Sequence, residues 1–448
     1  MDNILKAISD AIWGMPTVAL ILGTGVYFTV KMRFLQVTSF NSMLKSFKHN
    51  ILDNKKANPV RVISTALAAT VGTGSITGVA TALTLGGAGA IFWLWVSAFF
   101  GMAVAYGEGV LSIKYRSGKK GGIMYAVKNG IGEPHTAAMY AFFTVAASFG
   151  MGSMAQSNSA AQALSSEFSI PPTVTASAVA LAAAVCLFSK RDITGRLCSW
   201  FVPFLSVAYI AVTLAVIVKN RSGILPAFEK IIIEAFGIRE ACAGMAGFAV
   251  KNAVSVGFKR GVFSNEAGLG TTAAIHAQSE VESAHEQGLM NMLEVIIDTF
   301  VICTLTAVAI LSSVNIDATG CPDGAELVTT ACRTVFGGLS GKIVAVSIAG
   351  FAAATVLGWS KIGLSAAQYL KPGQNTVYKL MFTASAFLGA VISLDRAWMI
   401  SDIFNGLMIF PCTAALIILR REIVGEYYKR PVEPKPLSPR SLSGSSSA

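Results

Sequence analysis

Long apolar runs separated by short polar gaps dominate this sequence. A helix that crosses a bilayer needs about 20 mainly apolar residues. The pattern therefore predicts an all-α membrane protein with about 11 transmembrane helices. The predicted spans are 12–31, 62–84, 88–113, 136–164, 172–189, 198–218, 241–258, 291–313, 342–362, 377–394 and 398–419.

The composition supports a bilayer as the solvent. Apolar residues make up 53% of the 448 residues and charged residues only 13%, against roughly 25% charged in an ordinary soluble domain. The formal net charge of +11 does not indicate nucleic acid as a partner, because the Lys and Arg residues lie scattered in the gaps between apolar runs. No GxSxG, HExxH or Walker motif is present, so the sequence predicts neither an enzyme nor an ATP-driven pump.

The positive charges predict the orientation, because cytoplasmic connections carry an excess of Lys and Arg. The connections rich in these residues are 31–61, 114–128, 190–196 and 420–430. With eleven spans they all fall on one side, whereas 85–88 and 165–172 on the other side are nearly free of Lys and Arg. We therefore expect a multi-pass protein of the plasma or inner membrane with its N-terminus outside and its C-terminus in the cytoplasm.

The spans also suggest internal symmetry. If the first span is set aside, the remaining ten divide into residues 62–218 and 241–419, and the first helices of the two halves run in opposite directions. That is the arrangement of an inverted repeat. We predict a single transmembrane domain over 1–430 and a disordered cytoplasmic tail over 431–448, which is rich in Pro and Ser.

A glycine-rich stretch, Val71-Gly72-Thr73-Gly74-Ser75, interrupts the second apolar run. Each glycine disfavours a helix by about 1 kcal/mol relative to alanine, and an unwound backbone at membrane depth must line a cavity or be buried in protein. The freed N–H groups would suit a carboxylate and the freed carbonyls a cation such as Na⁺. The alternative is a packing face, because Gly74 and Gly78 form a GxxxG pattern.

A second break is predicted at 257–270, in the span related to the first by the repeat. Phe263, Ser264 or Asn265 would contact a bound substrate there. The alternative is the cytoplasmic end of a helix, capped by Ser264 or Asn265.

Other polar groups within spans are candidates for the same site. Gln156-Ser157-Asn158 should face the bundle interior and would either bind substrate or hold helices together. Thr355 offers a hydroxyl oxygen suited to Na⁺. Trp359 would wall a small apolar pocket, or alternatively lie at the membrane interface.

Two acids, Glu108 and Asp298, lie in or near spans and are functional candidates by default. We favour structural pairing for both, with Glu108 close to Lys114 and Arg116. Cys321 and Cys332, outside the cell in this topology, would form a disulfide or remain free thiols; the sequence leaves both open.

Taken in order, these motifs resemble the alanine/glycine:cation symporter family from about residue 10 to 420. The matching runs are 32–36, 66–74, 89–96, 98–102, 259–270, 356–360 and 405–406. The most specific of them is Lys259-Arg260-Gly261-Val262-Phe263-Ser264-Asn265-Glu266-Ala267-Gly268-Leu269-Gly270. The resemblance implies a leucine-transporter-like fold, with one extra N-terminal helix and two inverted five-helix repeats. It also implies Na⁺-coupled import of small neutral amino acids, with H⁺ as the less common coupling ion.

By the same resemblance, the substrate would be held by residues from four spans: Thr73, Gly74, Ser75, Gln156, Phe263, Asn265 and Trp359. Na⁺ would lie between the carbonyl groups of Thr70 or Val71 and Thr355. Ser75 replaces the asparagine usual in the family and Ala354 replaces a hydroxyl residue. Both sites therefore have fewer polar groups than is usual in the family. Lys361, where an aromatic residue is usual, would either weaken Na⁺ dependence as a fixed cation or extend to the cytoplasmic interface.

Three functions remain open at this stage: a Na⁺-coupled alanine or glycine symporter, the same scaffold coupled to H⁺ or to no ion, and a non-transporting amino-acid sensor. The expected partners are the lipid bilayer and a small neutral amino acid. A monomer is compatible with the pattern, which does not fix the oligomeric state.

Overall fold

Helices make up most of the part of the chain that the structure describes, as the apolar runs predict. The computed structural model describes residues 7–9, 11–48, 57–189, 192–237, 246–281, 283–318, 321–373, 375–392 and 394–429. Within these ranges, β structure is limited to an isolated bridge between Ser117 and Lys120. The predicted tail at 431–448 and the first residues of the predicted second repeat, 241–245, lie outside the described residues.

The longer helices are α2 (Met15–Lys31), α5 (Ala57–Thr70), α6 (Thr77–Gly86), α7 (Gly89–Lys114), α9 (Pro134–Phe149), α10 (Ala155–Phe168), α11 (Pro172–Phe188), α12 (Ile193–Lys219), α13 (Ile224–Ala235), α14 (Ala246–Asn265), α16 (Ala284–Val295), α17 (Thr304–Ser313), α18 (Gly324–Phe336), α19 (Ser340–Leu370), α20 (Thr376–Gly389) and α21 (Leu394–Ile418). Shorter helices are α3 (Leu35–Thr38), α4 (Phe40–Lys48), α8 (Ile123–Ala126), α15 (Ala273–His276) and α22 (Arg420–Tyr428). Short segments of other helix types include the 3₁₀ turn η2 (Thr73–Ser75) and the π-helical segments η4 (Gly150–Met154) and η7 (Ile296–Cys303).

The helix starts follow ordinary rules of local chemistry. Helices α9 and α11 begin at Pro134 and Pro172, where a missing N–H costs nothing. Helix α12 is capped by Asp192, whose carboxylate accepts a bond of 3.0 Å from the N–H of Gly195. These signals place the helix boundaries within a few residues of the predicted ones.

Among the described residues, six helical segments are long and apolar enough to cross a membrane, which makes this a multi-pass membrane protein. They are Gly89–Lys114, Pro134–Phe168, Ile193–Lys219, Ala284–Ser313, Gly324–Leu370 and Ser401–Ile418. Shorter apolar helices are Met15–Lys31, Val60–Thr70, Thr77–Gly86 and Pro172–Phe188. Helix occupies each of the eleven predicted segments where they are described, but only six segments reach spanning length, so the count of eleven stays a prediction.

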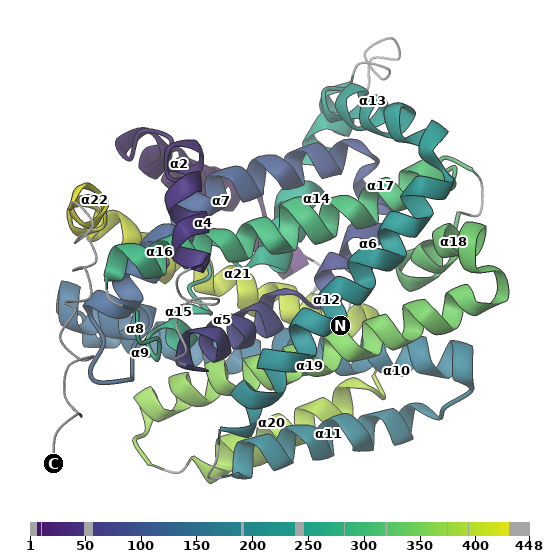
Figure 1. Cartoon of the computed structure of the whole chain (residues 1–448). Coiled ribbons are helices and arrows are strands. Elements are labelled where there is room, and N and C mark those ends of the chain that lie inside the picture. The colour runs from purple at the N-terminus through teal and green to yellow at the C-terminus, as the bar shows by residue number, and fades with distance from the viewer. Residues whose placement is uncertain are drawn as a thin grey trace, which may run out of the picture.

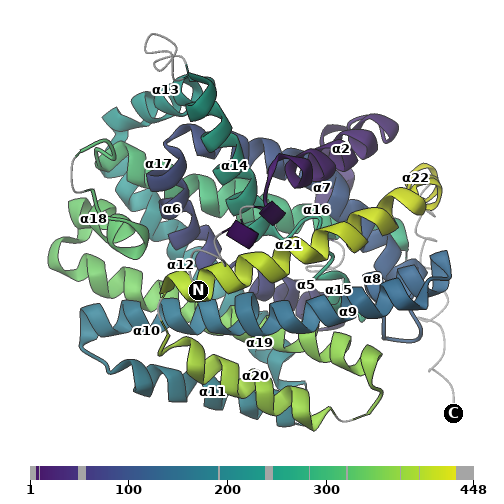
Figure 2. The same cartoon turned by 180° about the vertical axis from the view of Figure 1, so that it is seen from behind.

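The discontinuous helices lie inside the bundle. Helix α14 packs against α6 and α7, while α19 packs against α5, α9 and α10. In Figure 1, α10, α11, α19 and α20 form a layer at the bottom and α13 lies at the top. Figure 2 shows α21 crossing the opposite side, beside α9. The break between α5 and α6 is thereby enclosed by helices rather than exposed to lipid.

The second break begins later than predicted and shares only residues 266–270 with the predicted range of 257–270. Helix α14 continues through Phe263 to Asn265, and the chain leaves helical geometry only at 266–272. Gly257 lies inside helix α14 and does not unwind it. A β-carbon there would lie 2.5 Å from the carbonyl oxygen of Ala90, so the glycine allows α14 to pack closely against α7. It is a close-packing glycine. The unwound segment instead contains Gly268 and Gly270, with φ of 93° and 69°.

Two further expectations concern the cysteines Cys321 and Cys332 and the lysine Lys361. Cys321 and Cys332 are both free thiols, so the disulfide alternative does not hold. The Lys361 ammonium lies 2.5 Å from the Asp192 carboxylate at the start of α12. Lys361 therefore reaches outward to a polar partner, as the snorkelling interpretation predicts.

A glycine contact between α5 and α19 provides a test of this packing. A β-carbon on Gly358 would lie 2.7 Å from the backbone nitrogen of Ala69. We expect Gly358→Ala to lower the unfolding free energy by about 1–3 kcal/mol, because the two backbones must separate. The control is Gly23→Ala in α2, where a β-carbon meets no atom within 4 Å. Thermal unfolding in detergent should show a lower midpoint for Gly358→Ala alone; equal midpoints would contradict the packing.

Candidate functional site

The first break has the geometry that its glycines predict. Helix α5 ends at Thr70, one turn of 3₁₀ helix spans Thr73–Ser75, and α6 starts at Thr77. Thr73 and Ser75 are 0% exposed, so the unwound backbone is buried in protein. The carbonyl groups of residues 68–71 accept no hydrogen bond from the part of the chain that is described, and the N–H groups of Gly72 and Gly74 donate none. The break thus holds unpaired acceptors and donors at one place.

Of the polar trio in α10, one residue reaches this break. The amide oxygen of Gln156 accepts bonds from the Thr73 hydroxyl at 2.9 Å and the Thr73 N–H at 3.4 Å. Asn158 instead donates to the carbonyl oxygens of Gly389 and Ile392, at 2.7 and 2.6 Å. Both predicted roles occur, on different residues: Gln156 contacts the candidate site, and Asn158 holds helices together.

Thr355 in α19 faces the break from the other side. A β-carbon on Gly72 would lie 2.5 Å from the Thr355 hydroxyl oxygen. That oxygen is buried and has no hydrogen-bond partner within the described ranges. The Thr70 hydroxyl donates back to its own helix, to Ala66 and Leu67. The carbonyl groups of Thr70 and Val71 accept no hydrogen bond within the described chain and are available. A set of hard, uncharged oxygen atoms fits a small alkali cation.

Helix α14 contributes an aromatic wall. The Phe263 ring lies against Gly74, at 3.2 Å from the position of an added β-carbon. Asn265 is turned to other partners, because its amide donates to the Thr299 hydroxyl at 3.2 Å and accepts from the Ala267 N–H at 3.0 Å. The structure therefore brings Phe263 to the first break, whereas Asn265 is hydrogen-bonded to Thr299 and Ala267.

Trp359 is a core residue, so the membrane-interface alternative is wrong. It is 0% exposed and packs against Gly152. Its indole N–H donates to the Glu266 carboxylate at 2.8 Å. Glu266 is the residue at which the second break begins, and its φ is 56°. Trp359 thus links α19 to the second break.

The expected pairing of Glu108 with Lys114 and Arg116 is also wrong. The Glu108 carboxylate accepts bonds from the N–H groups of Gly268 and Gly270, at 2.8 and 3.0 Å. The physical reason is that these N–H groups, freed at the second break, need acceptors at membrane depth. The predicted break, 257–270, includes Gly268 and Gly270, but the sequence does not show that Glu108, about 160 residues earlier, lies beside them.

Asp298, a functional candidate for which structural pairing was favoured, contacts both the first break and the end of α14. Its carboxylate accepts bonds from the hydroxyls of Ser75 at 2.5 Å and Ser264 at 2.7 Å. The available signal was an acid about two turns into an apolar span.

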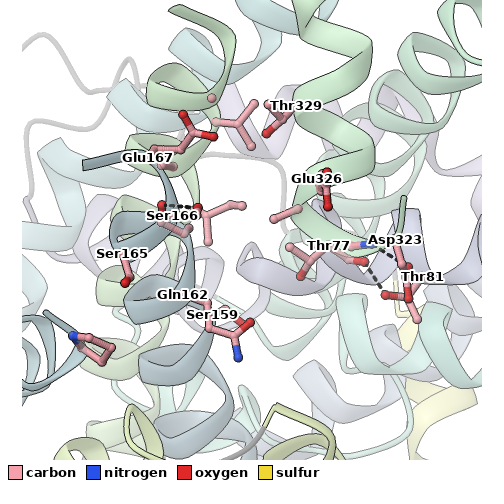
Figure 3. A pocket seen from close by; sticks show the side chains of 18 of the residues that line it. Thr77, Thr81, Ser159, Gln162, Ser165, Ser166, Glu167, Asp323, Glu326 and Thr329 are labelled. Carbon is pink, nitrogen blue, oxygen red and sulfur yellow. Dashed lines mark hydrogen bonds between the residues drawn. The ribbon is translucent and has the colours of Figure 1, made fainter. Parts of the chain in front are cut away.

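A polar cavity lies next to the break. It has a volume of about 720 Å³ and includes Thr77, Ser159 and Glu167 in its lining. Figure 3 shows Thr77 and Asp323 on one side of this space, with Ser159 and Glu167 across it. The Thr77 hydroxyl donates to the Thr73 carbonyl at 2.8 Å, and Ser159 lies one turn after Gln156. The cavity therefore ends one turn from the break.

Comparison with known proteins agrees with this geometry. A family model described as the sodium:alanine symporter family matches residues 1–432. The chain belongs to the sodium:alanine symporter family. Members of this family are transporters, not enzymes.

A relative of this symporter is the sodium/alanine symporter AgcS of Methanococcus maripaludis, which is 36% identical over 440 residues, covering 95% of this chain and 96% of the relative. Among solved structures, a manganese transporter of Eremococcus coleocola has a TM-score of 0.56 at 11% identity and covers 82% of this chain and 78% of that one. MhsT, crystallised with L-phenylalanine, has a TM-score of 0.50 at 14% identity, with coverage of 81% and 98%. These two likenesses support the predicted leucine-transporter-like fold of the symporter.

Substitutions at two glycines test whether the first break binds substrate or only packs helices together. A β-carbon on Gly74 would press on Phe263 and on the Ser264 backbone, whereas one on Gly78 meets no atom within 4 Å. We expect Gly74→Leu to abolish alanine binding while the protein still inserts into the membrane, and Gly78→Leu to retain binding. Binding of labelled alanine to purified variants measures this. Equal loss in both variants would indicate a GxxxG packing face instead.

Proposed function

We propose that this protein imports small neutral amino acids, alanine and glycine above all, by symport with Na⁺. The observation that carries the proposal is the unpartnered Thr355 hydroxyl oxygen beside Gly72 and the free carbonyls that end α5. The family membership and the 36% identity to a sodium/alanine symporter support the same function.

The proposed substrate site combines the break with its neighbours. The unpaired N–H groups of Gly72 and Gly74, which precede the start of α6, would hold the substrate carboxylate, as helix N-termini do for anions. Thr73, Gln156 and Ser75 would supply the other polar contacts. The bond between Thr73 and Gln156 would open to accept the substrate.

Aromatic residues would set the upper size of the substrate. Phe263 and Trp359 are 1% and 0% exposed and would wall the space around a small side chain. Asn265 would join the site only after exchanging its bonds with Thr299 and Ala267. A pocket enclosed in this way favours alanine and glycine over larger residues.

The proposed Na⁺ is a transported co-substrate. It would lie between the Thr355 hydroxyl and the carbonyl group of Thr70 or Val71. Binding there would join the end of α5 to α19 and offset the charge of the substrate carboxylate. The alternatives are coupling to H⁺, transport without ion coupling, and a sensor that binds amino acids without moving them.

We further propose eleven spans, with inverted repeats over about 62–218 and 241–419 and the N-terminus outside the plasma or inner membrane. In this topology the C-terminal end of α10 and helix α18 face outward. The cavity lined by Thr77 and Glu167 is then the external entrance to the break. The structure would then represent an outward-open conformation of the transporter.

Uptake into liposomes tests the proposal. Purified protein should accumulate labelled alanine and glycine with an inward Na⁺ gradient and much less with a H⁺ gradient alone. Accumulation that ignores Na⁺ would contradict Na⁺ coupling, and binding without any uptake would favour a sensor.

A change at Thr355 tests the ion site itself. We expect Thr355→Val to raise the Na⁺ concentration for half-maximal uptake by roughly 10-fold to 100-fold, since a lost contact to a charged group costs about 1.5–3 kcal/mol. Thr355→Ser keeps the oxygen and is the matched control. Equal Na⁺ dependence in the two variants would remove Thr355 from the ion site.

A further inference from the structure

Four polar side chains form a buried cluster where α15 meets α16. They are His276 from α15 and Gln287, Asn291 and Glu294 from α16, and each is at most 4% exposed. The His276 Nε2 atom lies 3.0 Å from the Glu294 carboxylate. The Gln287 amide nitrogen lies 2.8 Å from His276 Nδ1 and 3.0 Å from the Asn291 amide oxygen. None of these residues belongs to the proposed substrate or Na⁺ sites.

The cluster lies near a polar end of the helix bundle. Four residues after His276, Glu280 forms an exposed ion pair with Lys119 at 3.1 Å. The Arg116 guanidinium donates to two carbonyl groups in the turn that follows α15, at 3.1 and 2.7 Å. In the proposed topology this end of α15 faces the cytoplasm. The cluster therefore lies just inside the cytoplasmic face.

The hydrogen bonds of the cluster leave one negative charge unbalanced. Because the Gln287 amide donates to Nδ1, the single hydrogen of a neutral His276 ring is on Nε2, which donates to Glu294. Within the described ranges, no Lys or Arg pairs with Glu294. Its second carboxylate oxygen and the Asn291 amide nitrogen are buried without a hydrogen-bond partner in the described chain. A buried charge without a partner is costly.

One added proton balances this charge with the side chains in place. A proton on Nδ1 makes His276 an imidazolium, 3.0 Å from the Glu294 carboxylate. The Gln287 amide then turns over, so that its oxygen accepts from Nδ1. The Asn291 amide turns over as well, and its nitrogen, which has no partner now, donates to the same oxygen. The oxygen and nitrogen of an amide occupy nearly the same space, so one arrangement of side chains accommodates the cluster with and without the proton.

The charge of Glu294 acts on the second break. Glu108 holds the N–H groups of Gly268 and Gly270, and its carboxylate is close enough to Glu294 for the two charges to repel each other. An imidazolium at His276 offsets this repulsion. The protonation of the cluster is therefore linked to the segment that joins α14 to α15.

Few other charges face the cluster. Helices α4, α5, α7, α19 and α22 and the segment η7 pack against α15 or α16. Besides Glu108 and Arg116, their charged side chains and those of α16 have other partners or are exposed. Lys114 pairs with Glu422 and Glu426, Lys361 pairs with Asp192 beside Arg61, His285 bonds to Tyr106, Glu286 to Ser46, Asp298 to Ser75 and Arg420 to the Ile417 carbonyl, while Lys45, Lys48, Lys342 and Arg421 are exposed.

We propose that His276 and Glu294 form a proton-binding site on the cytoplasmic side, through which cytoplasmic pH regulates transport. The regulation rests on the proposed amino-acid uptake, whereas the proton site does not. With the proton bound, the ion pair holds α15 against α16 and relieves the repulsion on Glu108. This stabilises the proposed outward-open conformation, in which the cytoplasmic side is closed. An acidic cytoplasm therefore slows uptake, because the cytoplasmic side opens less readily.

Proton binding is tested without transport, by NMR of the full-length protein in detergent with nitrogen-15 in its histidine rings. The chain has four histidines, so the His276 signals are those missing from His276→Gln. The ring should change from its neutral to its charged form between about pH 5 and 8. In Glu294→Gln this change should need at least about tenfold more protons, since a nearby carboxylate favours the charged ring. A wild-type ring that stays neutral, or a Glu294→Gln variant that titrates like wild type, overturns the proton site.

Uptake of labelled alanine into liposomes tests the regulation. At fixed external pH and Na⁺ gradient, wild type should be about fivefold or more slower at an internal pH of about 6 than at about 8, a size typical of coupled sites. His276→Gln keeps an N–H donor for Glu294 but takes up no proton, so it should lose this dependence, as should Glu294→Gln. The control is His135→Gln, an exposed position at the start of α9, which should keep it.

The two readouts separate this inference from the proposed function. Equal dependence on internal pH in wild type and in His276→Gln overturns the regulation. If the wild-type His276 ring titrates as expected but the protein moves no amino acid, the proton site stands and the proposed function fails.

Discussion

A backbone that leaves its helix inside a bilayer must find partners for its N–H and carbonyl groups, because lipid offers none. This constraint explains the centre of the molecule. At the second break, the N–H groups of Gly268 and Gly270 are paired by the Glu108 carboxylate. At the first break, the N–H groups of Gly72 and Gly74 and the carbonyls of residues 68–71 have no such partner within the described chain. The protein therefore satisfies the N–H groups of Gly268 and Gly270 at the second break itself. The backbone groups of the first break remain available to a substrate and an ion.

The sequence predicted the helices and the first break well, because both depend on local chemistry. Apolar runs of bilayer length and prolines at helix starts are visible without any contacts, and so are Gly72 and Gly74. The second break was predicted to begin too early, at residue 257 and not at 266, because a glycine such as Gly257 has two physical uses in a membrane helix. It allows close approach to Ala90, and the sequence does not distinguish that from unwinding. The true break depends on Glu266, Gly268 and Gly270, whose conformations are fixed by partners far along the chain.

Side-chain partners were predicted less well, for the same reason. Glu108, Trp359 and Asn158 each bond to an atom in a distant segment of the chain, more than 90 residues away in every case. Neighbouring charges in the sequence suggested Lys114 for Glu108, although Lys114 in fact pairs with Glu422 at 3.0 Å. The prediction that Gln156, Ser157 and Asn158 face the bundle interior is confirmed by their burial, because polar side chains in an apolar helix are unfavourable against lipid.

The central claim is that the break from Val71 to Ser75 holds the substrate. A structure of the purified protein determined with alanine and NaCl tests it most directly. The account predicts density for alanine with its carboxylate at the N–H groups of Gly72 and Gly74 and its methyl group facing Phe263. Alanine found only in the cavity between Glu167 and Asp323, with the Thr73–Gln156 bond still intact, would contradict it.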